Sequence, residues 1–222
     1  MNRALIIFAK EPLPGKVKTR LAQDVGERVA AELYGAMLAD LLEIAHSLDT
    51  VRPLLFWALE TSTMPDCPGF PGLEMFEQQG ADLGERMNNA FIKAFSLGMD
   101  VCCCIGSDLP DLPVEYIRRA FCKLESPDTD VVLGPAEDGG YYLVGMKKLN
   151  AGLFRDIAWS TGMVLATSLK RADELQLKTT LLPPWYDIDL IGDLRRLASS
   201  PGKSAPRTRA LFHNLMEMAE KQ

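Results

Sequence analysis

The segment "ALIIFAKEPLPGKVKTRLA" (residues 4–22) joins a continuous apolar run to a loop rich in cations. The apolar run, ALIIFA, lacks the alternation of a half-exposed strand, so we expect a strand that is buried on both faces. Such strands are typical of parallel sheets that helices cover on both sides. The cationic loop directly follows this strand. Because ligands of open α/β sheets bind beyond the carboxyl ends of the strands, the loop lies at a position suited to a ligand.

The rest of the chain alternates between short apolar runs and amphipathic segments. We expect further strands at 53–59, 72–78, 100–106, 130–135, 141–146 and 179–183. Apolar residues at helical spacing predict helices at 24–48, 82–98, 113–123, 162–175, 190–198 and 210–222. Asp24 and Glu27 have the spacing of a capping box at the start of the first helix. This alternation predicts a single α/β domain over residues 1–222, with a mainly parallel sheet and right-handed crossovers.

The overall charge limits the kinds of partner that the protein binds. The 222 residues include 24 Lys and Arg and 30 Asp and Glu, which gives a net charge of −6. This acidity argues against a nucleic acid or a membrane surface as partner. No apolar run approaches the roughly 20 residues of a membrane span, and the N-terminus lacks the features of a signal peptide. We therefore expect a cytoplasmic protein whose local basic loop binds a small anion.

The basic loop contains five candidate phosphate-binding residues. A Pro-Gly pair predicts a turn, and Gly15 would let the backbone approach a ligand closely. Lys16, Lys18 and Arg20 alternate, so an extended loop would project all three to one side. Together with Lys10 they suit a di- or triphosphate, although the spacing is not that of a Walker A loop. The alternative is a cationic loop that is simply solvated.

Carboxylates in two other segments could hold a divalent cation. Asp108 emerges from the buried strand of "CCCIGSDLPDLP" (102–113), where it could bind Mg²⁺ or Mn²⁺ beside phosphates. Equally, Asp108 or Asp111 could cap the helix that starts near Pro113. Asp187 and Asp189 share a face if "DIDL" is extended, and one of them could complete a metal site. For Asp189 we favour the cap of the following helix.

The segment "GPAEDGGYYLVGM" (134–146) is the third candidate region. Asp-Gly is a strong signal for a tight turn, and a plain turn is the first interpretation. Glu137 and Asp138 could also orient or deprotonate an acceptor. Gly139 and Gly140 would let the backbone approach that ligand closely.

Five motifs in this order resemble a known bacterial family. They are FAKEPLPGKVKTRLA, QQGADLGERMNNAF, GSDLPDLP, GPAEDGGYYLVGM and YDIDLIGDLRRL, and they span about residues 4–198. The family is assigned to the GT-A, or nucleotide-diphospho-sugar transferase, superfamily, and its members carry a glycosyltransferase label. The segment KTRLA and the helix after it also resemble the start of phospholactate guanylyltransferases, which share this fold.

The resemblance implies a three-layer α/β/α sandwich that binds a nucleotide-linked donor with Mg²⁺ or Mn²⁺. It implies that Gly15, Lys16, Lys18 and Arg20 hold the donor phosphates, and that Asp108 holds the metal. The match to the D-x-D metal motif of the superfamily is incomplete, because Asp108 lies in Ser-Asp-Leu. The second metal ligand is therefore left open, with Asp189 as its candidate.

We thus expect a metal-dependent transferase that uses a nucleotide-diphospho-sugar donor and a small-molecule acceptor. Shared fold does not decide the reaction. One alternative is a nucleotidyltransferase that moves a nucleoside monophosphate from a triphosphate to a phosphorylated acceptor. Another is a sensor that binds nucleotides without turnover. The sequence predicts no oligomeric state.

Overall fold

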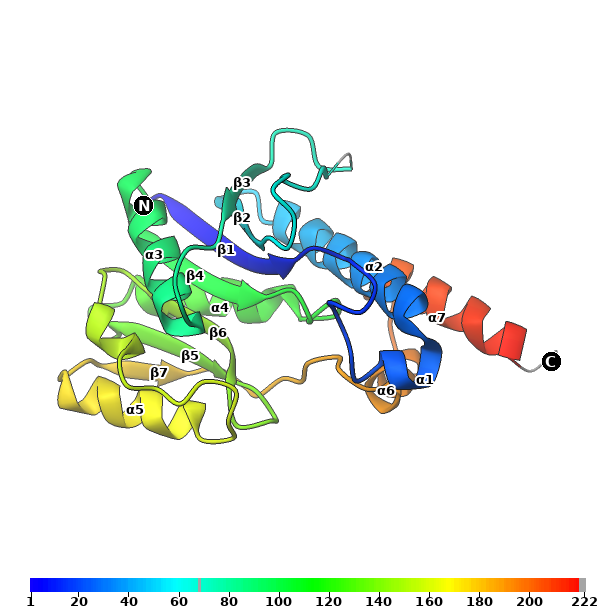
Figure 1. The fold of residues 1–222 in the computed structure, drawn as a ribbon. Coiled ribbons are helices and arrows are strands. Elements are labelled where there is room, and N and C mark those ends of the chain that lie inside the picture. Colours follow the sequence, from blue (N-terminus) through cyan, green and yellow to red (C-terminus); the bar gives the residue numbers. More distant parts are fainter. Residues whose placement is uncertain (68, 220–222) are drawn as a thin grey trace.

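The computed structural model describes residues 1–67 and 69–219, which form a seven-stranded sheet in the order β3-β2-β1-β4-β6-β5-β7 (Figure 1). The strands are β1 (Arg3–Lys10), β2 (Val51–Ala58), β3 (Glu74–Glu77), β4 (Val101–Gly106), β5 (Val131–Pro135), β6 (Tyr141–Met146) and β7 (Thr179–Leu181). Strand β6 runs antiparallel to both neighbours, and the other pairs are parallel. The expected α/β fold with a mainly parallel sheet is confirmed.

Helices cover both faces of the sheet and make the expected three layers. Helices α2 (Glu27–His46) and α4 (Val114–Leu124) pack on one face. Helices α3 (Leu83–Ser96) and α5 (Val164–Glu174), with the short 3₁₀ helix η1 (Ala151–Phe154), pack on the other. Helices α1 (Ala22–Val25), α6 (Ile191–Ser199) and α7 (Pro206–Ala219) lie beyond the carboxyl end of β1 (Figure 1). They share a third apolar cluster with α2.

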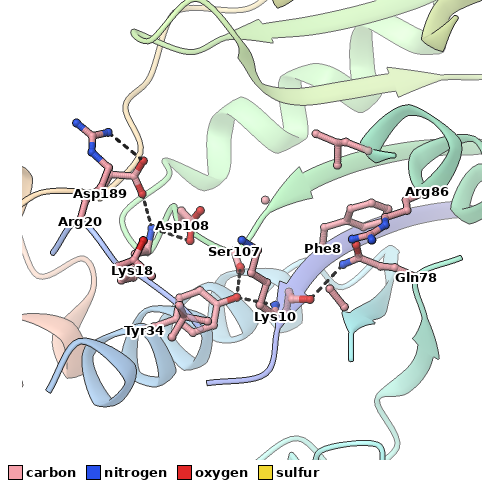
Figure 2. Close-up of a pocket in the computed structure, with 16 residues that line it drawn as sticks. Phe8, Lys10, Lys18, Arg20, Tyr34, Gln78, Arg86, Ser107, Asp108 and Asp189 are labelled. Atoms are coloured by element: carbon pink, nitrogen blue, oxygen red, sulfur yellow. Dashed lines mark hydrogen bonds and ion pairs between the residues drawn. The ribbon is translucent and has the colours of Figure 1, made fainter. Parts of the chain in front are cut away.

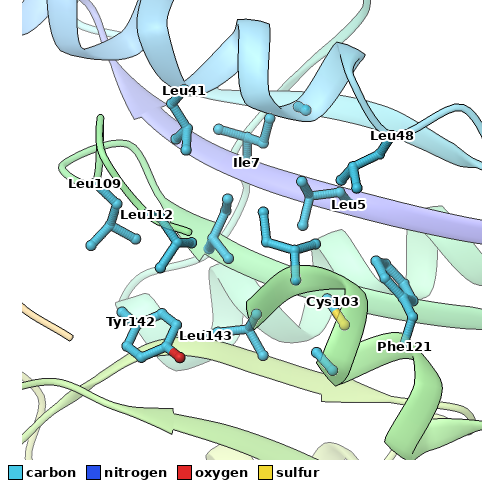
Figure 3. Packing of buried hydrophobic residues seen from close by; sticks show 14 of the residues in the cluster. Leu5, Ile7, Leu41, Leu48, Cys103, Leu109, Leu112, Phe121, Tyr142 and Leu143 are labelled. Atoms are coloured by element: carbon cyan, nitrogen blue, oxygen red, sulfur yellow. The ribbon is translucent and has the colours of Figure 1, made fainter. Parts of the chain in front are cut away.

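The central strand β4 shows how the sequence places the core. Cys103 packs with Leu5 and Ile7 under α2 and α4 (Figure 3), whereas Cys102 and Cys104 join the cluster on the opposite face. All three thiols are free and buried, and burial raises the pKa of Cys103. They therefore act as small apolar side chains, as expected for a strand that is buried on both faces.

The predicted capping box of the first long helix is wrong. Gly26 has φ +84°, and its N–H donates to the Ala22 carbonyl, which ends α1 and starts α2 at Glu27. No side chain caps α2. A glycine in left-handed backbone thus breaks the segment that apolar spacing had predicted to be one helix. The predicted last helix begins earlier, at Pro206, and its end at 220–222 lies outside the described residues.

None of the helices in residues 1–67 and 69–219 combines the length and the hydropathy of a membrane span.

Candidate functional site

A cavity of about 420 Å³ opens at the carboxyl ends of β1 and β4 (Figure 2). Its walls come from Phe8–Lys10, the loop at 17–20, Gly106–Asp108 and Asp189, with Gln78 and Arg86 at the far end. Parallel β1 and β4 end side by side, so the loops that follow them meet here. The cavity therefore lies where ligands bind in open α/β sheets.

Lys18 joins the two predicted metal carboxylates. Its Nζ lies 2.8 Å from Asp108 Oδ1 and 2.8 Å from Asp189 Oδ1, and its side chain is only 4% exposed. Burial alone would lower the pKa of Lys18, but the charges of Asp108 and Asp189 outweigh it and raise that pKa above its usual value. Arg20 lies farther out, with Nη1 4.0 Å from Asp189 Oδ2. The cavity thus has one end with two cations and two carboxylates.

The basic loop is not extended, so the expectation that its three cations share one side is wrong. The Lys16 N–H donates to the Leu13 carbonyl and the Ala22 N–H to the Lys18 carbonyl, at 3.0 and 2.8 Å, and these bonds fold the loop into turns. Lys16 points to Glu60, 3.1 Å from Nζ to Oε2, and does not line the cavity.

The two remaining residues of the phosphate prediction occupy different places. Gly15 has φ +76°, and a Cβ there would lie 3.2 Å from Glu27 Oε2, so its close neighbour is a protein carboxylate. Lys10 does line the cavity.

Tyr34 of α2 connects the ends of the two strands, and sequence reasoning missed it. Its hydroxyl accepts the Lys10 N–H at 2.8 Å and lies 2.6 Å from Ser107 Oγ. Burial, followed by the charge of Asp108, raises the pKa of Tyr34 to about 12, so the hydroxyl keeps its proton. The available signal was a tyrosine, with its polar hydroxyl, on the buried face of a helix, because a buried tyrosine hydroxyl usually needs a hydrogen-bond partner.

The helix-cap interpretations of three aspartates are wrong. Asp193 caps α6 instead of Asp189, because its carboxylate accepts the N–H groups of Asp189 and Leu190 at 3.0 and 2.8 Å. Helix α4 starts after Pro113 with no side-chain cap. Asp108 bonds Lys18, and Asp111 accepts the Tyr186 hydroxyl at 2.7 Å. Asp108 and Asp189 are therefore available to the cavity.

Asp187 lies close to these carboxylates. Burial, followed by the charges of Asp108, Asp138 and Asp189, raises the pKa of Asp187 to about 7, and Lys18 opposes this. Lys18 also acts on Asp189: burial tends to raise the pKa of Asp189, but Lys18 and Arg20 hold it below its usual value. The cavity end thus carries several acidic groups close to a single buried ammonium.

The segment 137–140 forms the turn that its Asp-Gly pair predicts. Asp138 Oδ1 accepts the Gly140 N–H at 2.8 Å, and Gly139 has φ +90° and donates its N–H to the Ala136 carbonyl. Glu137 accepts two bonds from Arg196, at 2.7 and 2.9 Å, and these bonds lower its pKa. None of the four residues lines the cavity.

Gln78 and Arg86 form the opposite end of the cavity, and sequence reasoning gave neither of them a role. Gln78 Nε2 donates to the carbonyls of Ala9 and Phe56, at 3.1 and 2.9 Å, which fixes the amide so that Oε1 remains an open acceptor. Arg86 Nε donates to the Gly80 carbonyl at 3.2 Å, and its Nη groups face the cavity end (Figure 2). The only signal was their place in the motif QQGADLGERMNNAF.

The fold resembles that of several solved structures. A protein from Desulfovibrio desulfuricans G20, described as a "putative nucleotide-diphospho-sugar transferase", is 33% identical, with a TM-score of 0.89 over 99% of this chain and 97% of that chain. A CMP:2-keto-3-deoxy-manno-octonic acid synthetase complexed with CTP is 10% identical, with a TM-score of 0.56 and full coverage of both chains. Rv0371C of Mycobacterium tuberculosis H37Rv, in complex with manganese, is 15% identical, with a TM-score of 0.53 over 90% and 99% of the chains.

The likeness to the last two structures concerns the fold alone. No curated protein matches the chain. A family profile matches residues 41–161, more than half of the chain, and the Desulfovibrio protein matches along nearly the whole length. The chain therefore belongs to the family described as "Uncharacterized protein conserved in bacteria (DUF2064)".

Proposed function

We propose that this protein is a metal-dependent transferase that binds a nucleotide-diphospho-sugar donor in the 420 Å³ cavity. The observation that supports this most is the pairing of Lys18 and Arg20 with Asp108 and Asp189 at one end of that cavity. Cations there suit phosphate oxygens, and carboxylates suit the cation that accompanies them. The likeness to a described nucleotide-diphospho-sugar transferase supports the same donor.

The donor set at this end fits Mg²⁺ or Mn²⁺. The Oδ1 atoms of Asp108 and Asp189 converge on a single point, the Lys18 ammonium. Hard divalent cations prefer such oxygen ligands, and Mg²⁺ commonly takes one or two carboxylates together with substrate phosphates. No group of three or more His, Cys, Asp or Glu side chains among the described residues forms a metal site. The remaining ligands would therefore be phosphate oxygens and water.

The residues of the cavity would have different roles, which depend on where each of them lies. Arg20, with Lys18 once a phosphate is bound, would stabilise the charge that develops on the leaving phosphate. Asp108 and Asp189 would hold the cation, which when bound neutralises phosphate oxygens. Lys10 would add positive charge at the end of β1. Tyr34 would keep this strand end in register with Ser107.

The acceptor would approach from the side of Asp138, whose charge helps to raise the pKa of Asp187. Gly139 and Gly140 would let the acceptor come close to the backbone. Glu137 is a weaker candidate for contact with the acceptor, because Arg196 already binds both of its oxygens.

A nucleotidyl transfer is the second candidate, and the CTP complex of a synthetase with the same fold favours testing it. In that reaction an acceptor phosphate attacks the α-phosphate and pyrophosphate leaves. The protein would be incubated with sugar nucleotides and with nucleoside triphosphates, each with Mg²⁺ or Mn²⁺ and a panel of acceptors. Release of a nucleoside diphosphate from a sugar nucleotide would support glycosyl transfer. Release of pyrophosphate from a triphosphate would instead support nucleotidyl transfer.

Thermal-shift titration separates both reactions from a sensor without turnover. A ligand that binds only the native state raises its stability by mass action. A melting temperature that rises with a nucleotide, without product from any acceptor, would favour the sensor. If no nucleotide or sugar nucleotide raised it, with or without metal, the proposed donor site would be wrong.

A further inference from the structure

Lys18 occupies the position between two carboxylates where a bound cation would be expected. One ammonium is 2.8 Å from an oxygen of Asp108, which follows β4, and 2.8 Å from an oxygen of Asp189, which precedes α6 (Figure 2). The two oxygens are therefore no more than twice that distance apart. A positive charge between them offsets their mutual repulsion, and in this structure the chain itself supplies it.

The ammonium and a divalent cation cannot share this position. Both would bind the Oδ1 atoms of Asp108 and Asp189, and two positive charges a few ångströms apart repel each other beside a lysine side chain that is only 4% exposed. Because the Lys18 side chain is so enclosed, water and salt cannot screen its charge while the ammonium stays between the carboxylates. A metal that binds the Oδ1 atoms of both Asp108 and Asp189 must therefore displace Lys18.

The loop around Lys18 allows such a displacement. Lys18 itself has φ +48°, in the left-handed region that is unfavourable for a lysine. The segment is held by turns and is not part of the sheet, and the lysine stem has four rotatable carbons. A displaced ammonium would need a new anionic partner, and a phosphate group offers several strong acceptor oxygens.

We propose that the Lys18 ammonium is an internal cation that occupies the position between Asp108 and Asp189 and so prevents free metal from binding there. When metal and donor bind together, the ammonium moves onto a donor phosphate. This inference rests on the proposed donor and cation, and it adds that neither binds tightly alone. Metal and phosphate binding are then positively coupled: the metal displaces the Lys18 ammonium from the carboxylates, and the phosphate gives this ammonium a new anionic partner.

The first test measures Mn²⁺ binding without any nucleotide, by electron paramagnetic resonance of the free ion. Lys18→Met removes the ammonium and keeps an unbranched stem. Lys16→Met is the matched control, because Lys16 pairs with Glu60 outside the cavity. We expect Lys18→Met to bind Mn²⁺ about tenfold or more tightly than the wild type, and Lys16→Met to equal the wild type. Equal or weaker Mn²⁺ binding by a folded Lys18→Met protein would overturn the proposal.

The second test follows the wild-type protein, and a variant is needed only to assign one resonance. The Nζ resonance of Lys18 is followed by NMR in protein labelled with ¹⁵N-lysine, and assigned by its absence in Lys18→Arg. We expect little change with Mg²⁺ alone and a clear shift with Mg²⁺ and inorganic pyrophosphate together. The proposed movement of Lys18 onto a phosphate would be contradicted if the Nζ chemical shift changed with neither addition, or if it changed fully with Mg²⁺ alone.

These results separate the two proposals. If Lys18→Met gains Mn²⁺ affinity while no nucleotide stabilises the wild type, the internal cation is supported and the proposed donor is wrong. If a sugar nucleotide stabilises the wild type but Lys18→Met gains no Mn²⁺ affinity, the donor site stands and the role of Lys18 is wrong.

Discussion

The assignment of Asp193 to the cap of α6, and of Asp189 to the cavity, can be tested by a pair of substitutions. Asp193→Ala removes the carboxylate that accepts two backbone N–H groups at the start of the helix. Loss of such a cap typically costs about 0.5–2 kcal/mol, and two bonds to one charged group place this case at about 1–2 kcal/mol. For a protein of this size, that corresponds to a fall in melting temperature of roughly 2–8 °C.

Asp189→Asn is the matched change, because it keeps the size of the side chain and removes the charge that faces Lys18 and Arg20. We expect it to weaken stabilisation by metal and nucleotide about tenfold or more, since a charge-assisted contact is lost. Asp193→Ala should retain that stabilisation. Both proteins would be compared by differential scanning calorimetry, with and without Mn²⁺ and nucleotide. An unchanged melting temperature for Asp193→Ala would show that Asp193 does not cap α6, and full ligand stabilisation of Asp189→Asn would show that Asp189 does not bind the ligand.

Three further substitutions test other parts of the site. Tyr34→Phe should lower the free energy of unfolding by about 1–2 kcal/mol in urea titration, because Lys10 N–H and Ser107 lose their partner; Tyr116→Phe is the control, and an equal loss there would contradict this role. Arg86→Met should weaken donor binding several-fold in calorimetric titration, because the Nη groups face the cavity. It should lower the melting temperature of the free protein only slightly, because one exposed bond to the Gly80 carbonyl is lost; unaltered affinity would remove Arg86 from the site. Asp187 has a pKa raised to about 7 in the folded protein, so its contribution to stability is lost as pH rises from about 4 through 7. In metal-free buffer, Asp187→Asn should therefore lose less stability than the wild type between pH 5 and pH 8, and parallel curves would show that Asp187 does not titrate there.

The architecture could be predicted because its signals are local. Continuous apolar runs such as ALIIFA and VCCCIG read as strands buried on both faces, and the structure buries both. The rule that ligands bind beyond the carboxyl ends of strands then brought Lys18 and Asp108 to one place. Asp189 lies 81 positions farther along the chain than Asp108, and only the alternation of Asp187 and Asp189 in DIDL suggested a metal role for it, beside the helix cap that we favoured.

The details of the site depend on contacts between distant segments, which a single sequence does not display. Lys16 turns to Glu60 because the loop at 11–21 folds into turns, although alternation had placed Lys16 beside Lys18. Asp193 rather than Asp189 caps α6, and both have spacings that allow a cap. Gln78 gains its orientation from carbonyls on two separate strands. For Lys16 and Gln78 a tertiary partner decides between local options of similar energy.

The central claim is that one end of the cavity holds donor phosphates and a divalent cation together. The most direct measurement is a crystal structure with Mn²⁺ and the nucleotide that stabilises the protein most, with anomalous scattering used to locate the manganese. We expect an anomalous peak bound by Asp108 and Asp189, with phosphate oxygens beside it and the Lys18 ammonium moved onto a phosphate. A nucleotide bound elsewhere, or a Lys18 ammonium still between the two carboxylates with metal and nucleotide present, would contradict it.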